Sequence, residues 1–211
     1  MNLSILGAGR VGATLAQALA HQGHTITLGH RDPAAGEQKW QGPAVRHASL
    51  ADAASTADLV INAMPGDTSL QTLTALREPL QGKVLLDVSN ATQRTPGGMP
   101  DGLLYPGSSL AEQLQAALPQ TRVVKALNTM LFTVMVAPHS LATPPTAFLS
   151  GDDAGAKAQV KTLLADLGWP AAWLLDLGGI ESARATEALI LMVPHLIAAR
   201  GFKPFALTVA G

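Results

Sequence analysis

The chain begins Met1-Asn2-Leu3-Ser4-Ile5-Leu6-Gly7-Ala8-Gly9-Arg10-Val11-Gly12, an apolar strand that runs directly into G-x-G-x-x-G. Val11, Leu15 and Leu19 follow at helical spacing. In this context the first glycine permits a tight turn, the second lets the backbone approach a pyrophosphate, and the third lets helix and strand pack closely. Free N–H groups at the helix start favour an anion. The motif therefore predicts a dinucleotide site. Its alternative is a glycine-rich turn that only packs a helix.

The residues expected to bind the cofactor at this loop are Gly7, Ala8, Gly9, Arg10, Val11 and Gly12. The end of the next strand decides which dinucleotide is bound. There Arg31 offers a planar fork of donors to a ribose 2′-phosphate, and His30 offers a further donor. Asp32 is the competing ribose ligand, but Pro33 begins the next helix and makes Asp32 a natural cap. The sequence therefore favours NADP over NAD.

Short runs of Val, Ile and Leu alternate with segments of helical spacing along the chain. The expected strands are Leu3–Leu6, Thr25–Leu28, Leu59–Ile61, Val84–Val88, Val123–Leu127, Ala147–Leu149 and Trp173–Leu177. Near-continuous apolar strands separated by helices are typical of a parallel sheet covered on both faces. We expect an α/β fold with a doubly wound (Rossmann), largely parallel sheet and a small C-terminal α/β lobe.

Capping residues mark several helix boundaries. Gly23 ends the first helix where a left-handed residue is needed. Ser109 followed by Glu112 forms a capping box, and Asp153 caps a helix that Gly168 closes.

Two loops rich in Pro, Gly and polar residues interrupt this alternation: Asn90–Ser108 and Pro138–Pro145. The first is long for a compact domain, which favours a functional or partner-contacting loop. The second is the best boundary between a dinucleotide-binding domain, 1–140, and a small C-terminal lobe, 141–211, that carries dimerisation or the acceptor site.

Composition bounds the function further. The chain has 211 residues, no cysteine, and 14 Lys+Arg against 15 Asp+Glu. Disulfides and thiol chemistry are excluded, and a net charge of −1 gives no case for nucleic acid or an anionic membrane. The longest apolar stretch, Ala188–Ala199, is too short to span a bilayer. We expect a soluble, cytoplasmic protein without a signal peptide, and no metal site.

Further candidates end strands on the expected ligand-binding rim. Met64 and Pro65 follow one strand, and Pro65 is either a turn residue or a contact of ribose or nicotinamide. Asn90 and Asn128 follow two other strands, where each either binds cofactor or substrate or stabilises its turn. His195 lies in the final helix and is more typical of a core histidine. No nucleophile elbow or zinc helix is present, and the catalytic residue stays unknown.

The combination of these segments resembles the NADP-dependent reductases of the deazaflavin coenzyme F-420, with the STEAP metalloreductase domains as more distant kin. The resemblance runs nearly end to end. It is carried by the stretches Ser4–Gly12, Leu28–Pro33, Met64-Pro65, Asp87–Asn90, Val123–Thr129, Ser150–Asp153 and Gly178–Arg184.

This resemblance implies hydride transfer between NADP(H) and a small-molecule acceptor such as coenzyme F-420 or a flavin. It implies cofactor contacts at Ala8 to Val11, at His30 and Arg31, and at Met64 and Pro65 beside the nicotinamide. Gly66 departs from the family, which tends to carry a bulky aromatic there near the acceptor. Two alternatives remain: a small imine or keto-acid reductase, and an NADP(H)-binding sensor without turnover.

The family implies a homodimer, and the C-terminus supports one. Glu181–Arg200 reads as a long, largely apolar helix kinked at Pro194, and its stretch Ala188–Ala199 is too apolar on all sides to face water. The tail that follows contains Phe202 and Phe205. We expect this tail to lie against the partner subunit near Met64, Asn90 and Asn128. The alternative is that helix and tail cover their own subunit.

Overall fold

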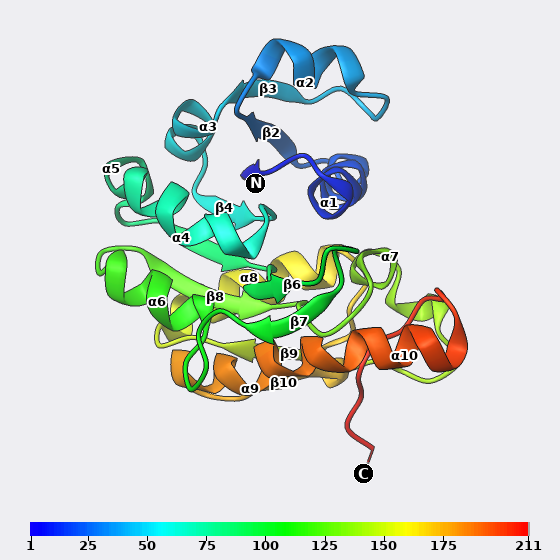
Figure 1. The fold of residues 1–211 in the computed structure, drawn as a ribbon. Coiled ribbons are helices and arrows are strands. Elements are labelled where there is room, and N and C mark those ends of the chain that lie inside the picture. Colours follow the sequence, from blue (N-terminus) through cyan, green and yellow to red (C-terminus); the bar gives the residue numbers. More distant parts are fainter. Residues whose placement is uncertain (211) are drawn as a thin grey trace.

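A computed structural model of the chain describes residues 1–210 (Figure 1). The strands are β1 (Asn2–Leu6), β2 (Thr25–His30), β3 (Arg46–Ser49), β4 (Leu59–Asn62), β5 (Val84–Asp87), β6 (Thr92–Arg94), β7 (Pro100–Leu103), β8 (Arg122–Ala126), β9 (Ala147–Ser150) and β10 (Leu174–Asp176).

The α-helices are α1 (Arg10–His21), α2 (Pro33–Lys39), α3 (Leu50–Thr56), α4 (Gly66–Ala75), α5 (Arg77–Leu80), α6 (Leu110–Ala117), α7 (Phe132–Met135), α8 (Ala154–Asp166), α9 (Ala183–Ala188) and α10 (Val193–Arg200). Short 3-10 helices are η1 (Pro138–Ser140), η2 (Ala171–Trp173), η3 (Ile180–Ser182) and η4 (Leu189–Met192).

One eight-stranded sheet organises the molecule, in the order β10-β9-β8-β5-β4-β1-β2-β3. The six strands from β3 to β8 in this order are parallel and follow the doubly wound arrangement, whose ligand site lies at the carboxyl ends of the strands. Strand β9 pairs antiparallel with β8, and β10 pairs parallel with β9. The predicted α/β, largely parallel fold is confirmed.

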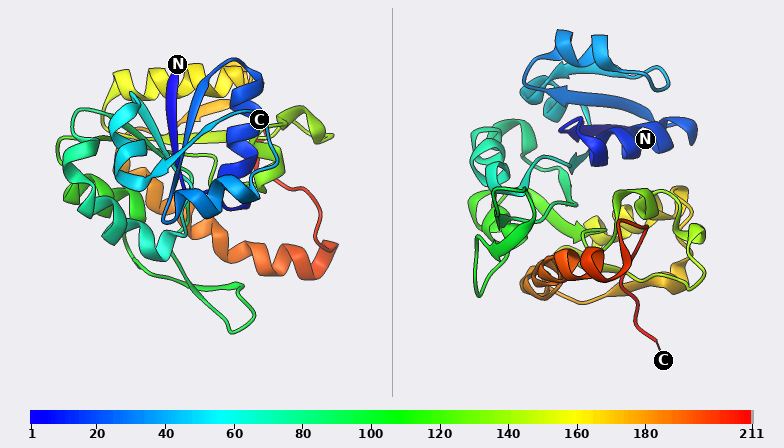
Figure 2. Two further views of the ribbon diagram at one scale, coloured as in Figure 1. Left: turned by 90° about the horizontal axis from the view of Figure 1, so that it is seen from above. Right: turned by 45° about the vertical axis from the view of Figure 1, so that its right-hand side comes forward.

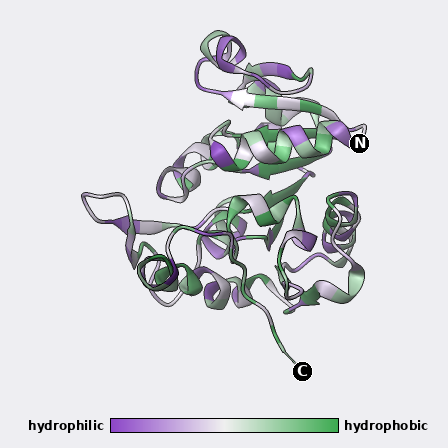
Figure 3. Ribbon diagram, turned by 90° about the vertical axis from the view of Figure 1, so that its right-hand side faces the viewer, coloured by the Kyte–Doolittle hydropathy of each residue, from purple (hydrophilic) through white to green (hydrophobic). Residues whose placement is uncertain are grey.

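Two apolar layers hold the helices on opposite faces of this sheet. Helices α1 and α8 pack on one face with Trp169, while α3, α4, α6 and α9 pack on the other. Hydrophobic residues concentrate in the central strands between these layers (Figure 3). Burial on both faces explains why β1, β4, β5 and β8 read as continuous apolar runs.

The predicted helix boundaries are confirmed by their hydrogen bonds. The side chains of Asp32, Ser109 and Asp153 each accept from a main-chain N–H in the first turn of the following helix. Gly23 and Gly168 adopt φ of +82° and +87° just past α1 and α8. These left-handed positions are ones at which a Cβ is strained.

The structure corrects the sequence-based description in two places. Strand β3 was not predicted, because its sequence, Arg-His-Ala-Ser, is short and polar and it pairs only with β2 at the sheet edge. The Asn90–Ser108 segment is not an irregular loop: it folds into the antiparallel hairpin β6–β7. The hairpin and the C-terminal helices extend beyond the sheet together (Figure 2, left), and β7 contacts η4.

The final helical segment runs from η3 to α10 and changes character before Pro194. Residues Leu189–Met192 form 3-10 turns, and α10 begins at Val193 with Pro194 in its first turn. Pro194 has no N–H to donate back into the preceding turn, so the predicted interruption there is explained. No helix among residues 1–210 is long and apolar enough to cross a membrane.

The C-terminal tail pairs with its own chain, while the expectation that it also reaches a partner stays a prediction. Leu131 N–H donates to the carbonyl of Phe205 at 2.9 Å, and Leu207 N–H donates to that of Thr129 at 3.2 Å. Strands β9 and β10 continue the main sheet, so no break in the sheet marks a boundary at residue 140. The division into 1–140 and 141–211 stays a prediction, as does the homodimer.

Candidate active site at the carboxyl edge of the sheet

The glycine loop between β1 and α1 leaves the start of a helix open. Gly7 adopts φ +98°, and a Cβ there would lie 2.9 Å from the carbonyl oxygen of Ala63. A Cβ on Gly9 would meet nothing within 4 Å, and Gly9 precedes α1 without any side-chain cap. The loop thus offers an uncovered helix N-terminus beneath open space, which suits a pyrophosphate.

Gly12 has a different role from its neighbours. A Cβ on Gly12 would lie 1.8 Å from the carbonyl oxygen of Gly7, so any side chain would push α1 off the loop. Gly12 is buried and lines neither of the cavities described below. Gly12 thus permits close packing of α1 on the loop and does not face either cavity.

An open groove of about 1170 Å³ runs from this loop over the end of β2. It is lined by Gly7, Ala8 and Gly9 on one side and by Met64 and Pro65 on the other. Its charged residues are Arg31, Asp32, Lys39 and Asp67, and His30 also lines it. Lys39 is a second cation, beside Arg31, at the β2 end of the groove. It was not predicted from the sequence, because it lies at the end of α2 and only the path of that helix brings it to the groove.

Asp32 is engaged as the cap of α2. Its Oδ1 accepts from the N–H of Ala35 at 3.0 Å, and Pro33 occupies the first position of the helix. Arg31 beside it is exposed. The predicted cap at Asp32 is confirmed, and the contact of Arg31 with a 2′-phosphate stays a prediction.

His30 contacts His47 through both a hydrogen bond and ring stacking. Its Nε2 lies 2.8 Å from Nδ1 of His47 on β3, and the two rings stack with centroids 5.0 Å apart. Burial lowers the pKa of His30 below its ordinary value of 6.5; His47 lowers it further, and the carboxylate of Asp32 acts in the opposite direction. His30 is therefore a neutral, positioned imidazole at neutral pH.

A second cavity, of about 460 Å³, opens on the other side of the loop. It shares Gly7, Gly9, Met64 and Pro65 with the groove, so the two spaces meet at these residues. Its far wall is apolar and comes from η4, α10, α7, the hairpin and the tail. That wall contains Met99, Met130, Phe132, Met135, Leu189, Ile190, Val193, Leu196, Ile197, Phe202, Phe205 and Leu207.

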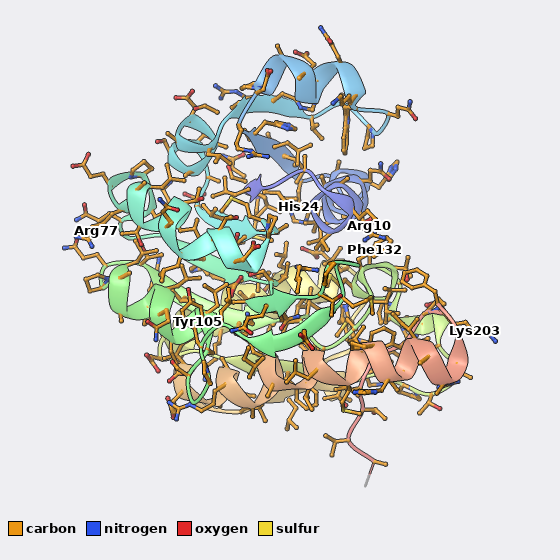
Figure 4. The ribbon with its side chains drawn as sticks, in the orientation of Figure 1. Arg10, His24, Arg77, Tyr105, Phe132 and Lys203 are labelled. Carbon is orange, nitrogen blue, oxygen red and sulfur yellow. The ribbon has the colours of Figure 1, made fainter. Side chains whose placement is uncertain are left out.

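Two arginines supply the charge in this cavity. Among the described residues lining it, Arg10 and Arg94 are the ionisable ones. Arg10 lies over the ring of Phe132, 5.9 Å from the ring centroid, and Figure 4 shows the pair where the glycine loop faces α7. A cation over an aromatic face is attractive, so this contact connects the loop to the apolar wall.

Asn90 and Asn128 both line the apolar cavity and bind each other. Asn90 Nδ2 donates to the main-chain oxygen of Asn128 at 2.9 Å, and Asn128 Nδ2 donates to Oδ1 of Asn90 at 3.0 Å. Leu127, between β8 and Asn128, has φ +62° and is the one non-glycine residue of 1–210 in the left-handed region. Such a conformation persists only where surrounding contacts hold it.

Gly66 sits against the same turn. A Cβ on Gly66 would lie 2.2 Å from the main-chain oxygen of Asn90 and 2.7 Å from the nitrogen of Ala91. A larger residue at this position therefore requires the segment after β5 to move. The close approach of Asn90 therefore depends on a glycine at position 66.

A buried charge network lies beneath the cavity floor. Lys125 Nζ lies 2.8 Å from Oδ2 of Asp87 and 2.8 Å from Oε1 of Glu187, and all three side chains are at most 4% exposed. Asp87 also accepts from Ser89, which lines the cavity, and from Asn62 at 2.9 Å. Glu187 accepts from the first N–H groups of α6. The network ties α9 to the central strands.

Burial by itself lowers the pKa of Lys125, but the carboxylates of Asp87 and Glu187 outweigh burial and hold that pKa above its ordinary value. Lys125 is therefore a fixed cation at neutral pH. Within residues 1–210 no group of three or more His, Asp or Glu side chains is arranged to hold a metal ion.

The comparisons with known proteins agree with this geometry. The family described as NADP oxidoreductase coenzyme F420-dependent matches residues 2–91. A crystal structure from Arthrobacter sp. FB24, described as a candidate F420-dependent NADP reductase, is 40% identical with a TM-score of 0.92, and the match covers 100% of both chains. The chain belongs to this family. The resemblance predicted from the sequence is confirmed.

Two curated relatives place the chain more broadly. The F420-dependent NADP reductase of Methanocaldococcus jannaschii is 30% identical over 141 residues, which are 65% of this chain and 61% of that protein. Metalloreductase STEAP3 of Rattus norvegicus is 28% identical over 209 residues, which are 93% of this chain and 39% of that protein. The aligned region thus spans less than two thirds of either curated relative.

Several lining residues had no sequence signal. Arg94 and Met99 come from the hairpin, and Phe132 from the four-residue helix α7, elements too short for periodicity to reveal. Phe202 and Phe205 were noted in the sequence but expected against a partner. Both residues line the cavity of their own chain, but Phe202 stays 63% exposed, so the contact with a partner stays a prediction.

Proposed function

We propose that the chain is an NADP(H)-dependent oxidoreductase that passes a hydride between the nicotinamide and a flavin- or deazaflavin-like ring. The observation that carries this proposal is the junction at Gly7, Gly9, Met64 and Pro65. There a polar groove over a helix N-terminus meets an apolar cavity of about 460 Å³. A dinucleotide along the groove would bring its nicotinamide to the mouth of the apolar cavity.

The residues that would hold the nucleotide follow from this placement. Main-chain N–H groups of Arg10 and Val11 would bind the pyrophosphate above Gly9. Arg31, with His30 beside it, would bind the 2′-phosphate, since the Asp32 carboxylate caps α2. Met64 and Pro65 would pack against the nicotinamide ring.

The apolar wall supports a planar acceptor. Methionine and phenylalanine side chains give adaptable and flat surfaces for a ring system, and α10 and the tail add further apolar side chains to them. The cofactor supplies the hydride chemistry, while the chain orients two rings and excludes water. Because the main chain of Asn90 occupies the space that a side chain at position 66 would need, the acceptor would stack on this wall rather than on such a side chain.

Imine or keto-acid reduction is less well supported. Those reactions need a proton donor at the substrate, and the ionisable side chains among the described lining residues are two arginines. An arginine does not release its proton at neutral pH. A sensor without turnover leaves the second cavity without a role.

The experiment mixes the protein anaerobically with NADPH and one acceptor class at a time: deazaflavin, FMN, FAD, ferric chelates, small ketones and cyclic imines. We expect oxidation of NADPH by a planar ring acceptor. Oxidation by imines or ketones alone identifies the reductase alternative, and tight NADPH binding with no oxidation by any class identifies the sensor.

A further inference from the structure

We infer that His47, which lies outside the nucleotide groove, sets the preference for NADPH over NADH by fixing the imidazole of His30. The inference rests on the proposed function, because it assumes that His30 faces the 2′-phosphate. It assigns His47 as a positioning residue. No sequence signal distinguishes His47, since it lies on the edge strand β3, which was not predicted.

The strand register brings the two imidazoles together. In the parallel pair β2–β3, His30 aligns with Ser49 and Leu28 aligns with His47. Side chains at aligned positions and at every second residue point to the same face of a sheet. His47 is therefore the diagonal neighbour of His30 on one face, and the Nε2–Nδ1 distance of 2.8 Å is a hydrogen bond.

Neighbouring elements leave the His30 ring little freedom. Its other nitrogen, Nδ1, lies beside Gly36 of α2, a residue that also lines the groove, and a Cβ there would lie 2.3 Å from it. His47 is held in turn by the ring of Trp40, edge-on with centroids 5.9 Å apart. Of the two imidazoles, only His30 lines the groove; the Trp40 ring lines it as well, but it touches His47 through an edge-on aromatic contact and not through a hydrogen bond. A change in the hydrogen bonding of His47 therefore reaches the nucleotide through His30.

One hydrogen atom lies between the two rings, and the ring to which it is bonded decides whether the Nδ1 of His30 is a donor or an acceptor toward a ligand. If His30 donates from Nε2, then neutral His30 has a bare lone pair on Nδ1, which repels a phosphate. If His47 donates from Nδ1, then neutral His30 carries its hydrogen on Nδ1 and is a donor. A bound 2′-phosphate selects the second arrangement, which needs His47 as the donor.

An added proton leads to the same donor state. A singly protonated pair keeps one hydrogen between the rings and carries one on each outer nitrogen. The other charged groups lining this groove are Arg31 and Asp32 after β2, Lys39 on α2 and Asp67 on α4. A phosphate dianion adds negative charge beside the pair and favours its protonation. NADPH should therefore bind with proton uptake at the pair, whereas NADH, which lacks the phosphate, should not.

The test measures the dissociation constants of NADPH and NADH between about pH 6.5 and 8.5, above the second pKa of about 6 of a phosphate monoester, whose remaining titration is common to the wild type and all variants. It compares the wild type with His47→Leu, which removes donor and proton acceptor. It also uses His47→Asn, whose amide donates but takes up no proton. His139→Leu is the matched control, because His139 packs on Trp173, with centroids 4.6 Å apart, and does not line the groove.

We expect His47→Leu to weaken NADPH binding about tenfold at neutral pH, the value of one hydrogen bond to a charged group, and to leave NADH binding unchanged. His47→Asn should keep most of the preference but lose its rise toward acid pH. His139→Leu should match the wild type. Because a merely structural role of His47 would weaken both nucleotides alike, the split between them and the pH profile identify the positioning role.

Contrary outcomes are distinct. An unchanged NADPH preference and pH profile in His47→Leu overturns this inference and leaves the proposed function standing. Wild type that binds neither nucleotide overturns the proposed function, and this inference with it. If His47→Leu loses its thermal unfolding transition, His47→Asn decides: an unaltered pH profile in that variant overturns the inference.

Discussion

Asn90 and Asn128 close the carboxyl edge of the sheet by binding each other, with one hydrogen bond to a main-chain oxygen at 2.9 Å and one between side chains at 3.0 Å. Each residue was a candidate ligand contact or a turn-stabilising asparagine. The structure shows the stabilising role directly, with the amide of each residue occupied by the other. Both residues line the cavity wall, and the hydrogen bonds between them set the spacing between the ends of β5 and β8.

Asn90→Ala removes both hydrogen bonds and leaves the oxygen of Asn128 without this donor. The expected loss is about 1–2 kcal/mol of unfolding free energy, measured by urea denaturation. Because the wall of the acceptor cavity loosens, the KM for the acceptor should rise while the Kd of NADPH is unchanged. Equal weakening of NADPH and acceptor would show that the pair instead belongs to the nucleotide site.

Gly9→Val and Gly12→Ala separate the two roles in the glycine loop. A side chain on Gly9 enters open space, so Gly9→Val should fold normally and lose NADPH binding. A Cβ on Gly12 collides with Gly7, so Gly12→Ala should cost about 3 kcal/mol or more of stability. Thermal unfolding and NADPH titration measure both effects. A folded Gly9→Val protein with wild-type affinity would refute the dinucleotide site.

Arg31→Ala and Asp32→Ala test the choice of cofactor. Loss of a charge-assisted contact should reduce the preference for NADPH about 10- to 100-fold, with NADH affinity unchanged. Asp32→Ala removes only the cap of α2, so it should cost about 1 kcal/mol of stability and keep the preference. If Asp32→Ala instead abolishes NADH binding, Asp32 is the ribose ligand.

The buried Lys125 should dominate stability far more than a surface lysine. Lys125→Met leaves the carboxylates of Asp87 and Glu187 without their cation and should cost about 3–5 kcal/mol. Lys157→Met breaks a surface pair with Asp176 and should cost at most about 1 kcal/mol. Chemical denaturation of both variants gives the comparison. Similar losses in the two would contradict the buried network's role.

The same network predicts a pH dependence with a definite sign. Because the folded-state pKa of Lys125 is raised, its contribution to stability is complete below its ordinary pKa of 10.5. The contribution is lost as pH rises through the higher folded-state value. Wild-type stability should thus fall as pH rises from 10.5 toward the folded-state pKa, and Lys125→Met should lack this component of the fall.

Truncation after Arg200 removes Phe202, Phe205 and Leu207 from the cavity wall. Because these residues face the acceptor space and not the nucleotide groove, acceptor turnover should fall at least about tenfold while NADPH affinity changes little. A double variant, Phe202→Ala with Phe205→Ala, is the control that keeps the tail's main-chain contacts. Full turnover in the truncated protein would remove the tail from the site.

Strong local signals made most of the fold predictable from the sequence. The apolar runs of β1, β4, β5 and β8 identified the sheet because both of its faces are covered, and the caps at Asp32, Ser109 and Asp153 fixed helix starts. Strand β3 and the strands of the β6–β7 hairpin were not predicted because neither segment has periodically spaced apolar residues. Their strands form through pairing with partners that sequence alone does not reveal.

The site was predictable only where main-chain geometry defines it. Gly7 and Gly9 are required by the loop's own conformation, so their spacing was informative. The apolar wall depends on where α10 and the tail return, and Phe205 reaches it through the pairing of the tail with Leu131. The contact between His30 and His47 depends on strand register in the same way.

Anaerobic single-turnover mixing of the protein with NADPH and a planar acceptor tests the central claim most directly, because it observes hydride transfer itself. NADPH carrying deuterium at the transferring carbon should deliver the label to a ring carbon of a deazaflavin, where it does not exchange with water. With a flavin, whose accepting nitrogen exchanges its hydrogen with water, the same label should instead give a primary isotope effect on the reduction rate, and Gly9→Val should abolish the transfer to either ring. If bound NADPH is oxidised by no planar acceptor, or passes its label only to an imine or ketone, the account is contradicted.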